Sequence, residues 1–124
     1  MAKKILVIDD EELIIKSLRK LLEKNGFAVF VAKNGQDAIV MAEEEDFDLI
    51  IADIRMPGIN GVDTTQFIFE NLQKRNSEKI PVIFITGYAD KAIEKRAAAL
   101  NPVAYIYKPF DIQDLVEKVK TTLE

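Results

Sequence analysis

Short, almost purely apolar runs recur along the chain and are rich in Ile, Val and Phe. They cover residues 5–8, 27–32, 49–52, 82–85 and 103–106. They lack the alternation of apolar and polar residues that marks a strand with one face in water. Continuous apolar character is typical of strands that are covered on both faces of a parallel sheet. The pattern therefore predicts five buried strands.

Between these runs, apolar residues return at helical spacing. The clearest stripe follows Asp10 and ends before Gly26; it comprises Leu13, Ile14, Ser17, Leu18, Leu21 and Leu22, with Lys16, Arg19, Lys20 and Glu23 facing away. A second stripe follows Asp111, a favourable N-cap residue, and comprises Ile112, Leu115, Val116, Val119 and Leu123. Weaker patterns predict helices over residues 36–44, 62–74 and 91–100.

The alternation of strand and helix predicts an α/β fold, a doubly wound five-stranded parallel sheet with right-handed crossovers. With 124 residues the chain suits a single domain, and we expect residues 1–124 to form it without a separate effector domain. In open sheets of this kind, ligands bind at the carboxyl ends of the strands. The residues that follow each strand are therefore the candidates for chemistry.

Composition and charge narrow the range of functions. Hydrophobic residues at 48% and charged residues at 31% are typical of a globular protein. Seventeen Lys and Arg against twenty-one Asp and Glu give a net charge of −4, which argues against direct binding to nucleic acid or anionic membranes. No apolar run approaches the ~18 residues of a membrane span, and the first run is too short for a signal peptide. We therefore expect a cytoplasmic protein.

The chain contains no cysteine and no histidine. Thiol nucleophiles, thiolate metal sites, disulfides and imidazole acid-base catalysis are therefore excluded. Any chemistry must use carboxylates, hydroxyls, amines or a metal held by oxygen ligands.

Polar residues gather at the predicted carboxyl ends of the strands: Asp9, Asp10, Asp53, Thr86 and Lys108. Taken singly, each has a commoner role as a helix cap, strand end or solvated cation. Together, however, three carboxylates converge on one edge, and two charges ~4 Å apart repel by about 4 kcal/mol at an effective dielectric constant of about 20. A positive charge must share the site. Oxygen ligands alone favour a hard cation, Mg²⁺ or Mn²⁺, beside which a carboxylate such as Asp53 can attack a phosphoryl group.

The order of these motifs carries a family resemblance. The motifs are Asp9-Asp10-Glu11, Asp53-Ile54-Arg55-Met56-Pro57-Gly58 with Gly61, Thr86-Gly87, and Tyr105-Ile106-Tyr107-Lys108-Pro109-Phe110. From about Lys3 to Leu123 the chain resembles the response-regulator receiver domains of bacterial two-component signalling. The resemblance implies a (βα)5 flavodoxin-like fold with strand order 2-1-3-4-5.

The resemblance also implies a role for each site residue. Asp53 is the phosphoacceptor, and Thr86 and Lys108 contact the phosphoryl group. The metal ligands are Asp9, largely through water, Asp10, Asp53 and the backbone carbonyl of Arg55. Thr86 and Tyr105 form the switch, and Lys108-Pro109 is a cis peptide.

The function implied is a phosphorylation-dependent signalling switch, and not an enzyme that turns over an external substrate. A sensor histidine kinase or a histidine phosphotransfer protein would supply the phosphoryl group. The output to an unknown downstream protein, or a phosphorylation-dependent homodimer, would use the fourth helix, fifth strand and fifth helix. Arg55 and Tyr88 flank the expected path of a hydrolytic water, which predicts a long-lived phosphorylated state.

Three alternatives share parts of this pattern. A nucleotide-binding enzyme has the same sheet, but the glycines form neither G-x-G-x-x-G nor a P-loop. A phosphatase with an aspartyl intermediate would place its nucleophile after the first strand with an acid two positions on, whereas Asp9 and Asp10 are followed by Glu11 and Glu12. A receiver fold that is never phosphorylated would not need the complete acidic set.

Overall fold

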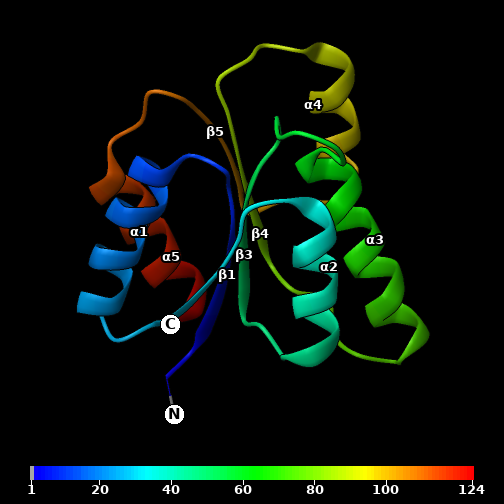
Figure 1. Ribbon diagram of the computed structural model, residues 1–124, viewed down its shortest axis with the longest axis horizontal. Helices are drawn as coiled ribbons and strands as arrows, with labels where there is room; N and C mark the ends of the chain where they lie inside the picture. The colour runs from blue at the N-terminus through cyan, green and yellow to red at the C-terminus, as the bar shows by residue number, and fades with distance from the viewer. Residues whose placement is uncertain (1) are drawn as a thin grey trace.

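Strands and helices alternate without exception along residues 2–124, the part of the chain that the computed structural model describes (Figure 1). The elements are β1 (Lys4–Ile8), α1 (Glu12–Lys24), β2 (Ala28–Ala32), α2 (Gly35–Glu44), β3 (Leu49–Asp53), α3 (Gly61–Lys74), β4 (Val82–Thr86), α4 (Lys91–Ala98), β5 (Ala104–Tyr107) and α5 (Ile112–Leu123). The predicted elements are confirmed. Two bounds matter for function, because Asp53 and Thr86 are the last residues of their strands rather than loop residues.

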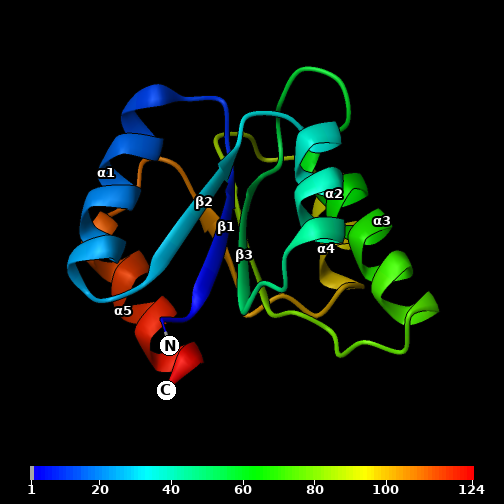
Figure 2. The same ribbon diagram turned by 60° about the horizontal axis from the view of Figure 1, so that its bottom comes forward.

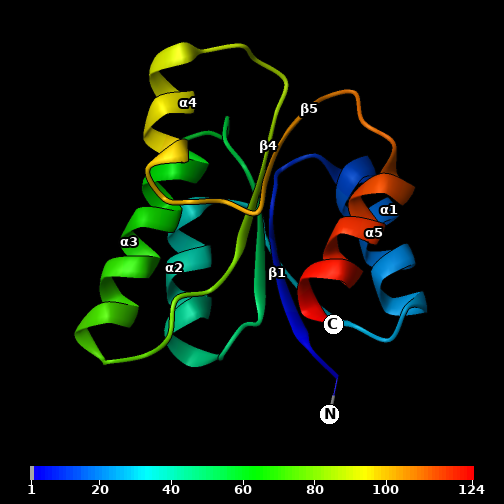
Figure 3. The same ribbon diagram turned by 180° about the vertical axis from the view of Figure 1, so that it is seen from behind.

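The strands form one parallel sheet in the order β2-β1-β3-β4-β5, as the resemblance implied. Helices α1 and α5 cover one face of the sheet, and α2, α3 and α4 cover the other (Figures 1 and 3). Viewed from another side, β2 lies at one edge beside β1 (Figure 2). Among the described residues, no helix is long and apolar enough to cross a membrane.

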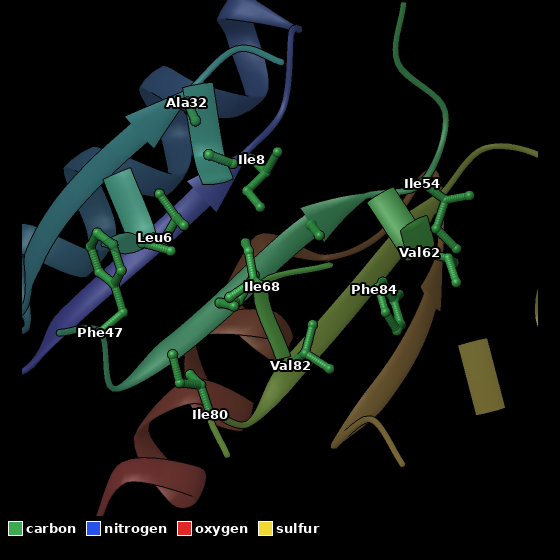
Figure 4. Packing of buried hydrophobic residues seen from close by; sticks show 14 of the residues in the cluster. Leu6, Ile8, Ala32, Phe47, Ile54, Val62, Ile68, Ile80, Val82 and Phe84 are labelled. Atoms are coloured by element: carbon green, nitrogen blue, oxygen red, sulfur yellow. The ribbon is translucent and has the colours of Figure 1, made fainter. Parts of the chain in front are cut away.

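Each strand sends alternate side chains into two separate hydrophobic clusters. Leu6 and Ile8 of β1 point toward α2 and α3, where they join Phe47, Ile68 and other residues (Figure 4). Ile5 and Val7 pack on the opposite face against α1 and α5. Because both faces of the sheet are covered, the inner strands are apolar at every position except one end, which explains the pattern in the sequence.

Helix α1 buries most of the predicted stripe. Leu18 and Leu22 are buried, and Ile14 and Leu21 are partly buried against the same hydrophobic cluster, as predicted. The prediction was wrong for Leu13, which is 81% exposed, and for Ser17, which is also exposed, and it missed the buried Ile15. In α5 the predicted stripe is confirmed, and the Asp111 side chain caps the helix by accepting a hydrogen bond from the Gln113 N–H at 2.8 Å.

Gly61 brings the start of α3 against the end of β3. Its N–H donates to the Ile54 carbonyl at 2.8 Å, and a Cβ at this position would lie 2.1 Å from the Asp53 carbonyl oxygen. No larger residue fits without a shift of the backbone. The glycine in the sequence motif therefore serves close packing directly behind Asp53.

Candidate functional site

The sheet brings the candidate residues to one edge, because parallel strands end on the same side. The Asp9 N–H donates to the Ala32 carbonyl at 3.1 Å, so the ladder between β1 and β2 continues to the first acidic residue. Between β4 and β5, the Lys108 N–H donates in the same way to the Thr86 carbonyl at 2.7 Å. Backbone pairing with the neighbouring strands therefore determines the positions of the Asp9 and Lys108 Cα atoms at this edge.

Three carboxylates converge at this edge, as predicted. One oxygen from each of Asp9, Asp10 and Asp53 lies within 4.8 Å of the others. Asp9 and Asp53 are buried, with 1% and 3% of their surface exposed, while Asp10 is exposed. Asp9 Oδ1 accepts a hydrogen bond from the Glu11 N–H at 2.9 Å, but Asp9 Oδ2 is buried and has no hydrogen-bond partner. This unpartnered oxygen and the oxygen-only donor set fit a divalent cation.

Lys108 supplies the positive charge of the site. Its Nζ lies 3.5 Å from Asp53 Oδ2 and 3.9 Å from Asp9 Oδ2, and it forms a closer ion pair with Glu11 Oε1. The following Lys108-Pro109 peptide is cis, as the resemblance implied. Glu11 belongs to the first sequence motif, yet it was not predicted to take part in the site; its adjacency to Asp9 and Asp10 was the only available signal.

Burial and neighbouring charge shift the pKa values of the site. Desolvation, followed by the charge of Asp9, raises the pKa of Asp53 to about 6, against the opposing effect of Lys108. Desolvation also raises the pKa of Asp9. Burial alone would lower the pKa of Lys108, but the hydrogen bond to Glu11 and the charges of Asp9 and Asp53 raise it overall. Lys108 is therefore a permanent cation at neutral pH, and Asp53 is mostly ionised.

An open cavity of about 660 Å³ leads to Asp53. Its lining includes Asp10, Glu11, Lys108, Arg55 and Tyr88. The guanidinium carbon of Arg55 lies 4.0 Å from the centre of the Tyr88 ring, a cation–π contact. The structure therefore places both bulky residues beside the site, as expected, and also in contact with each other.

Thr86 and Tyr105 lie apart from this cavity. The Thr86 hydroxyl accepts a hydrogen bond from the Tyr88 N–H at 3.2 Å and donates to the Tyr88 carbonyl at 3.3 Å. Thr86 lines a neighbouring cavity with residues of the β3–α3 loop and the start of α4. The Tyr105 ring lies 6.4 Å from that of Phe84 and 5.5 Å from that of Tyr107, and its hydroxyl is buried without a hydrogen-bond partner. The sequence did not predict that the Thr86 hydroxyl bonds to Tyr88.

The comparison with known families agrees with this geometry. The profile of the response regulator receiver domain matches residues 5–120, nearly the whole chain. The chain belongs to the response regulator receiver domain family. This assignment decides against the nucleotide-binding enzyme that shares the same sheet topology.

Individual relatives of this receiver domain support the same family assignment. The polar-differentiation response regulator DivK of Brucella anthropi is 33% identical over 123 residues, which cover 99% of this chain and 98% of that protein. The crystal structure of a CheY-like response regulator receiver domain protein from Methanospirillum hungatei superposes with a TM-score of 0.89 at 29% identity, covering 99% of this chain and 94% of the other. A response regulator from Thermotoga maritima gives 0.81 at 28% identity, with coverages of 99% and 98%. This protein is therefore a receiver domain of two-component signalling, a family that works with histidine kinases and downstream targets.

Proposed function

We propose that this receiver domain accepts a phosphoryl group on Asp53 and thereby changes its binding to a downstream protein. The donor is the phosphohistidine of a sensor histidine kinase or of a histidine phosphotransfer protein. One observation carries the proposal: the buried carboxylate of Asp53 lies beside one cationic amine and two further carboxylates, at the base of an open cavity. The cytoplasmic location and the single-domain organisation expected from the sequence stay predictions.

The proposed transfer is a displacement at phosphorus. A carboxylate oxygen of Asp53 forms the new O–P bond, and the N–P bond of the donor breaks. The electron pair of that bond returns to the imidazole nitrogen, which takes up a proton from the solvent. With a pKa of about 6, Asp53 is ionised and nucleophilic near neutral pH. Lys108, 3.5 Å away, stabilises the negative charge on the transferred oxygens.

The proposed metal ligands are Asp9, Asp10, Asp53 and the backbone carbonyl of Arg55. Support comes from the three clustered carboxylates and the unpartnered Asp9 Oδ2. Mg²⁺ or Mn²⁺ held by these residues would supply positive charge to the phosphoryl oxygens. Without such charge, the three carboxylates repel an incoming phosphoryl donor.

The proposed output begins at Thr86. To donate to a phosphoryl oxygen, its hydroxyl must give up the long hydrogen bond that it donates to the Tyr88 carbonyl at 3.3 Å. Tyr105, in the adjacent strand, loses no side-chain hydrogen bond when its ring turns inward, because its hydroxyl has none. The proposed binding face comprises α4, β5 and α5, and includes the exposed residues Tyr107, Lys91, Lys95 and Arg96. A homodimer formed after phosphorylation would use the same face.

Labelling tests the proposal directly. Acetyl phosphate with Mg²⁺ should label the parental protein with one acid-labile acyl phosphate per chain, and Asp53→Asn should take none. The exposed Asp46→Asn is the matched control and should label like the parent. Labelling that persists in Asp53→Asn, or that is unaffected by chelation of the metal, contradicts the assignment. Sustained release of phosphate from an added ester would instead support the phosphatase alternative.

A further inference from the structure

Glu11 occupies the N-cap position of α1 but does not cap the helix with its side chain. Its backbone N–H is held by Asp9 Oδ1 at 2.9 Å. Its carboxylate, half exposed, instead pairs with Lys108, which lies 97 positions away in the chain. The side chain is therefore directed toward the site rather than toward the helix it begins.

We infer that Glu11 is a positioning residue that competes with Asp53 for the Lys108 amine until a phosphoryl group arrives. The inference rests on the proposed function. Three carboxylates compete for one amine, and the distances favour Glu11 over Asp53 at 3.5 Å and Asp9 at 3.9 Å. The receiver domain before phosphorylation therefore keeps its amine engaged with a group that takes no part in the transfer.

Phosphorylation reverses this competition. The phosphoryl group carries more negative charge than the carboxylate it modifies and adds three acceptor oxygens. It therefore attracts Lys108 more strongly than Glu11, whose carboxylate is partly screened by water. The Glu11–Lys108 pair opens when Lys108 contacts the phosphoryl group. The loop before α1 and the loop after β5 lose their shortest ion pair in the same step.

Removal of the Glu11 charge tests this competition. At saturating Mg²⁺, Glu11→Gln should be labelled by acetyl phosphate roughly two- to fivefold faster than the parent, the range expected for one exposed ion pair. Glu12→Gln is the matched control. Glu12 is the next residue and pairs with Lys33 away from the cavity, so this variant should label at the parental rate.

The same substitution in a Lys108→Gln protein distinguishes an effect of the Glu11–Lys108 ion pair from a general effect of removing one negative charge. If Glu11 acts through Lys108, the acceleration should disappear when Glu11→Gln is combined with Lys108→Gln and compared with Lys108→Gln alone. An equal acceleration in both backgrounds contradicts the inference, because it would reflect only weaker repulsion of the donor. The Lys108 side-chain ¹⁵N and ¹³C signals of the unphosphorylated protein should also shift in Glu11→Gln and stay unchanged in Glu12→Gln.

The outcomes distinguish this inference from the function on which it rests. A parental protein that takes no label contradicts the proposed function and the role of Glu11 together. A parental protein that labels at Asp53, beside a Glu11→Gln variant with the parental rate and unshifted Lys108 signals, contradicts the role of Glu11 alone.

Discussion

The buried Asp53 carboxylate lowers the stability of the folded domain and is also the proposed nucleophile. Its carboxylate is buried beside Asp9, and both desolvation and that neighbouring charge disfavour ionisation. Lys108 opposes this effect only in part. The charged form that a nucleophile requires is therefore the form that destabilises the folded domain.

The pH dependence of stability follows from this shift. The pKa of Asp53 rises from 3.8 to about 6 on folding, so between these values the folded state binds more protons than the unfolded chain. The free energy of unfolding therefore falls as pH rises through this window. Asp53→Asn should be more stable than the parent by up to about 3 kcal/mol at pH 8 without metal, and the difference should vanish below pH 4. Urea unfolding at several pH values measures it.

Two controls accompany this measurement. Asp46→Asn, an exposed carboxylate, should leave the stability unchanged at every pH. Saturating Mg²⁺ should reduce the advantage of Asp53→Asn, because a bound cation stabilises the parental carboxylate. A constant difference across the pH range would show that Asp53 titrates normally.

Arg55 and Tyr88 are expected to control the lifetime of the phosphorylated state. Both line the cavity beside Asp53, and their cation–π contact holds the two side chains together. A hydrolytic water must approach opposite the Asp53 oxygen, and these side chains obstruct that path. Their joint replacement by Ala should speed loss of phosphate by about three- to tenfold, a barrier change of about 0.7 to 1.4 kcal/mol. The decay of ³²P-labelled protein measures this rate.

Phe67→Ala provides the control for that experiment. Phe67 is an exposed aromatic residue of α3, outside the lining of this cavity and outside the proposed binding face, so its loss should leave the decay rate unchanged. A double variant of Arg55 and Tyr88 that decays at the parental rate or slower would show that they do not shield the site.

At the scale of the element, α1 shows how packing decides which apolar residues of a helix are buried. Leu18 and Leu22 pack in the hydrophobic cluster between the sheet and α5, and Ile15 is also buried, whereas Leu13 is 81% exposed. Leu13 and Ile15 are two residues apart, and on a helix such positions point in nearly opposite directions. The stability of this element should therefore depend on Ile15 and hardly on Leu13.

Paired substitutions test this assignment. Ile15→Ala should lower the free energy of unfolding by about 2–4 kcal/mol, because it leaves a cavity at a buried position. Leu13→Ala should change it by less than about 0.5 kcal/mol. Urea denaturation of the two variants measures both values. Similar losses for the two would mean that Leu13 is buried as well, as the sequence pattern predicted.

At the scale of the whole molecule, the site and the proposed output face are connected through the sheet. Thr86 is the last residue of β4. Tyr105 lies in the neighbouring strand β5, whose residues Ala104 to Tyr107 pair with β4. In the proposed transmission, a change at the Thr86 hydroxyl would act on a neighbouring strand that carries the exposed Tyr107. Within α4, Arg96 forms an ion pair with Asp63 of α3, which ties the position of α4 to that of α3.

A phosphoryl mimic should reveal this connection. Beryllofluoride with Mg²⁺ should shift backbone amide signals along α4, β5 and α5 as well as at the carboxylates, measured by ¹H–¹⁵N spectra. Thr86→Ala should retain the shifts around Asp53 and lose those on the distant face. Shifts confined to the metal-binding edge in the parental protein would contradict the proposed transmission.

Local patterns in the sequence were sufficient for the strands, the helices and most of the site. Each strand carries its own apolar run, and backbone pairing of parallel strands places their ends together, so Asp9, Asp10, Asp53 and Lys108 could be predicted to converge. The strand order came from the family resemblance and not from the periodicity of the chain.

Only the tertiary structure decided the features that depend on contacts between distant segments. The burial of Ile15 in place of Leu13 required the surface against which α1 packs, and the raised pKa of Asp53 required its burial beside Asp9. The Glu11–Lys108 pair joins residues 97 positions apart. The physical reason is the same in each case. A sequence specifies which groups are present, whereas the desolvation of a group and its distance from a partner are set only when the chain folds.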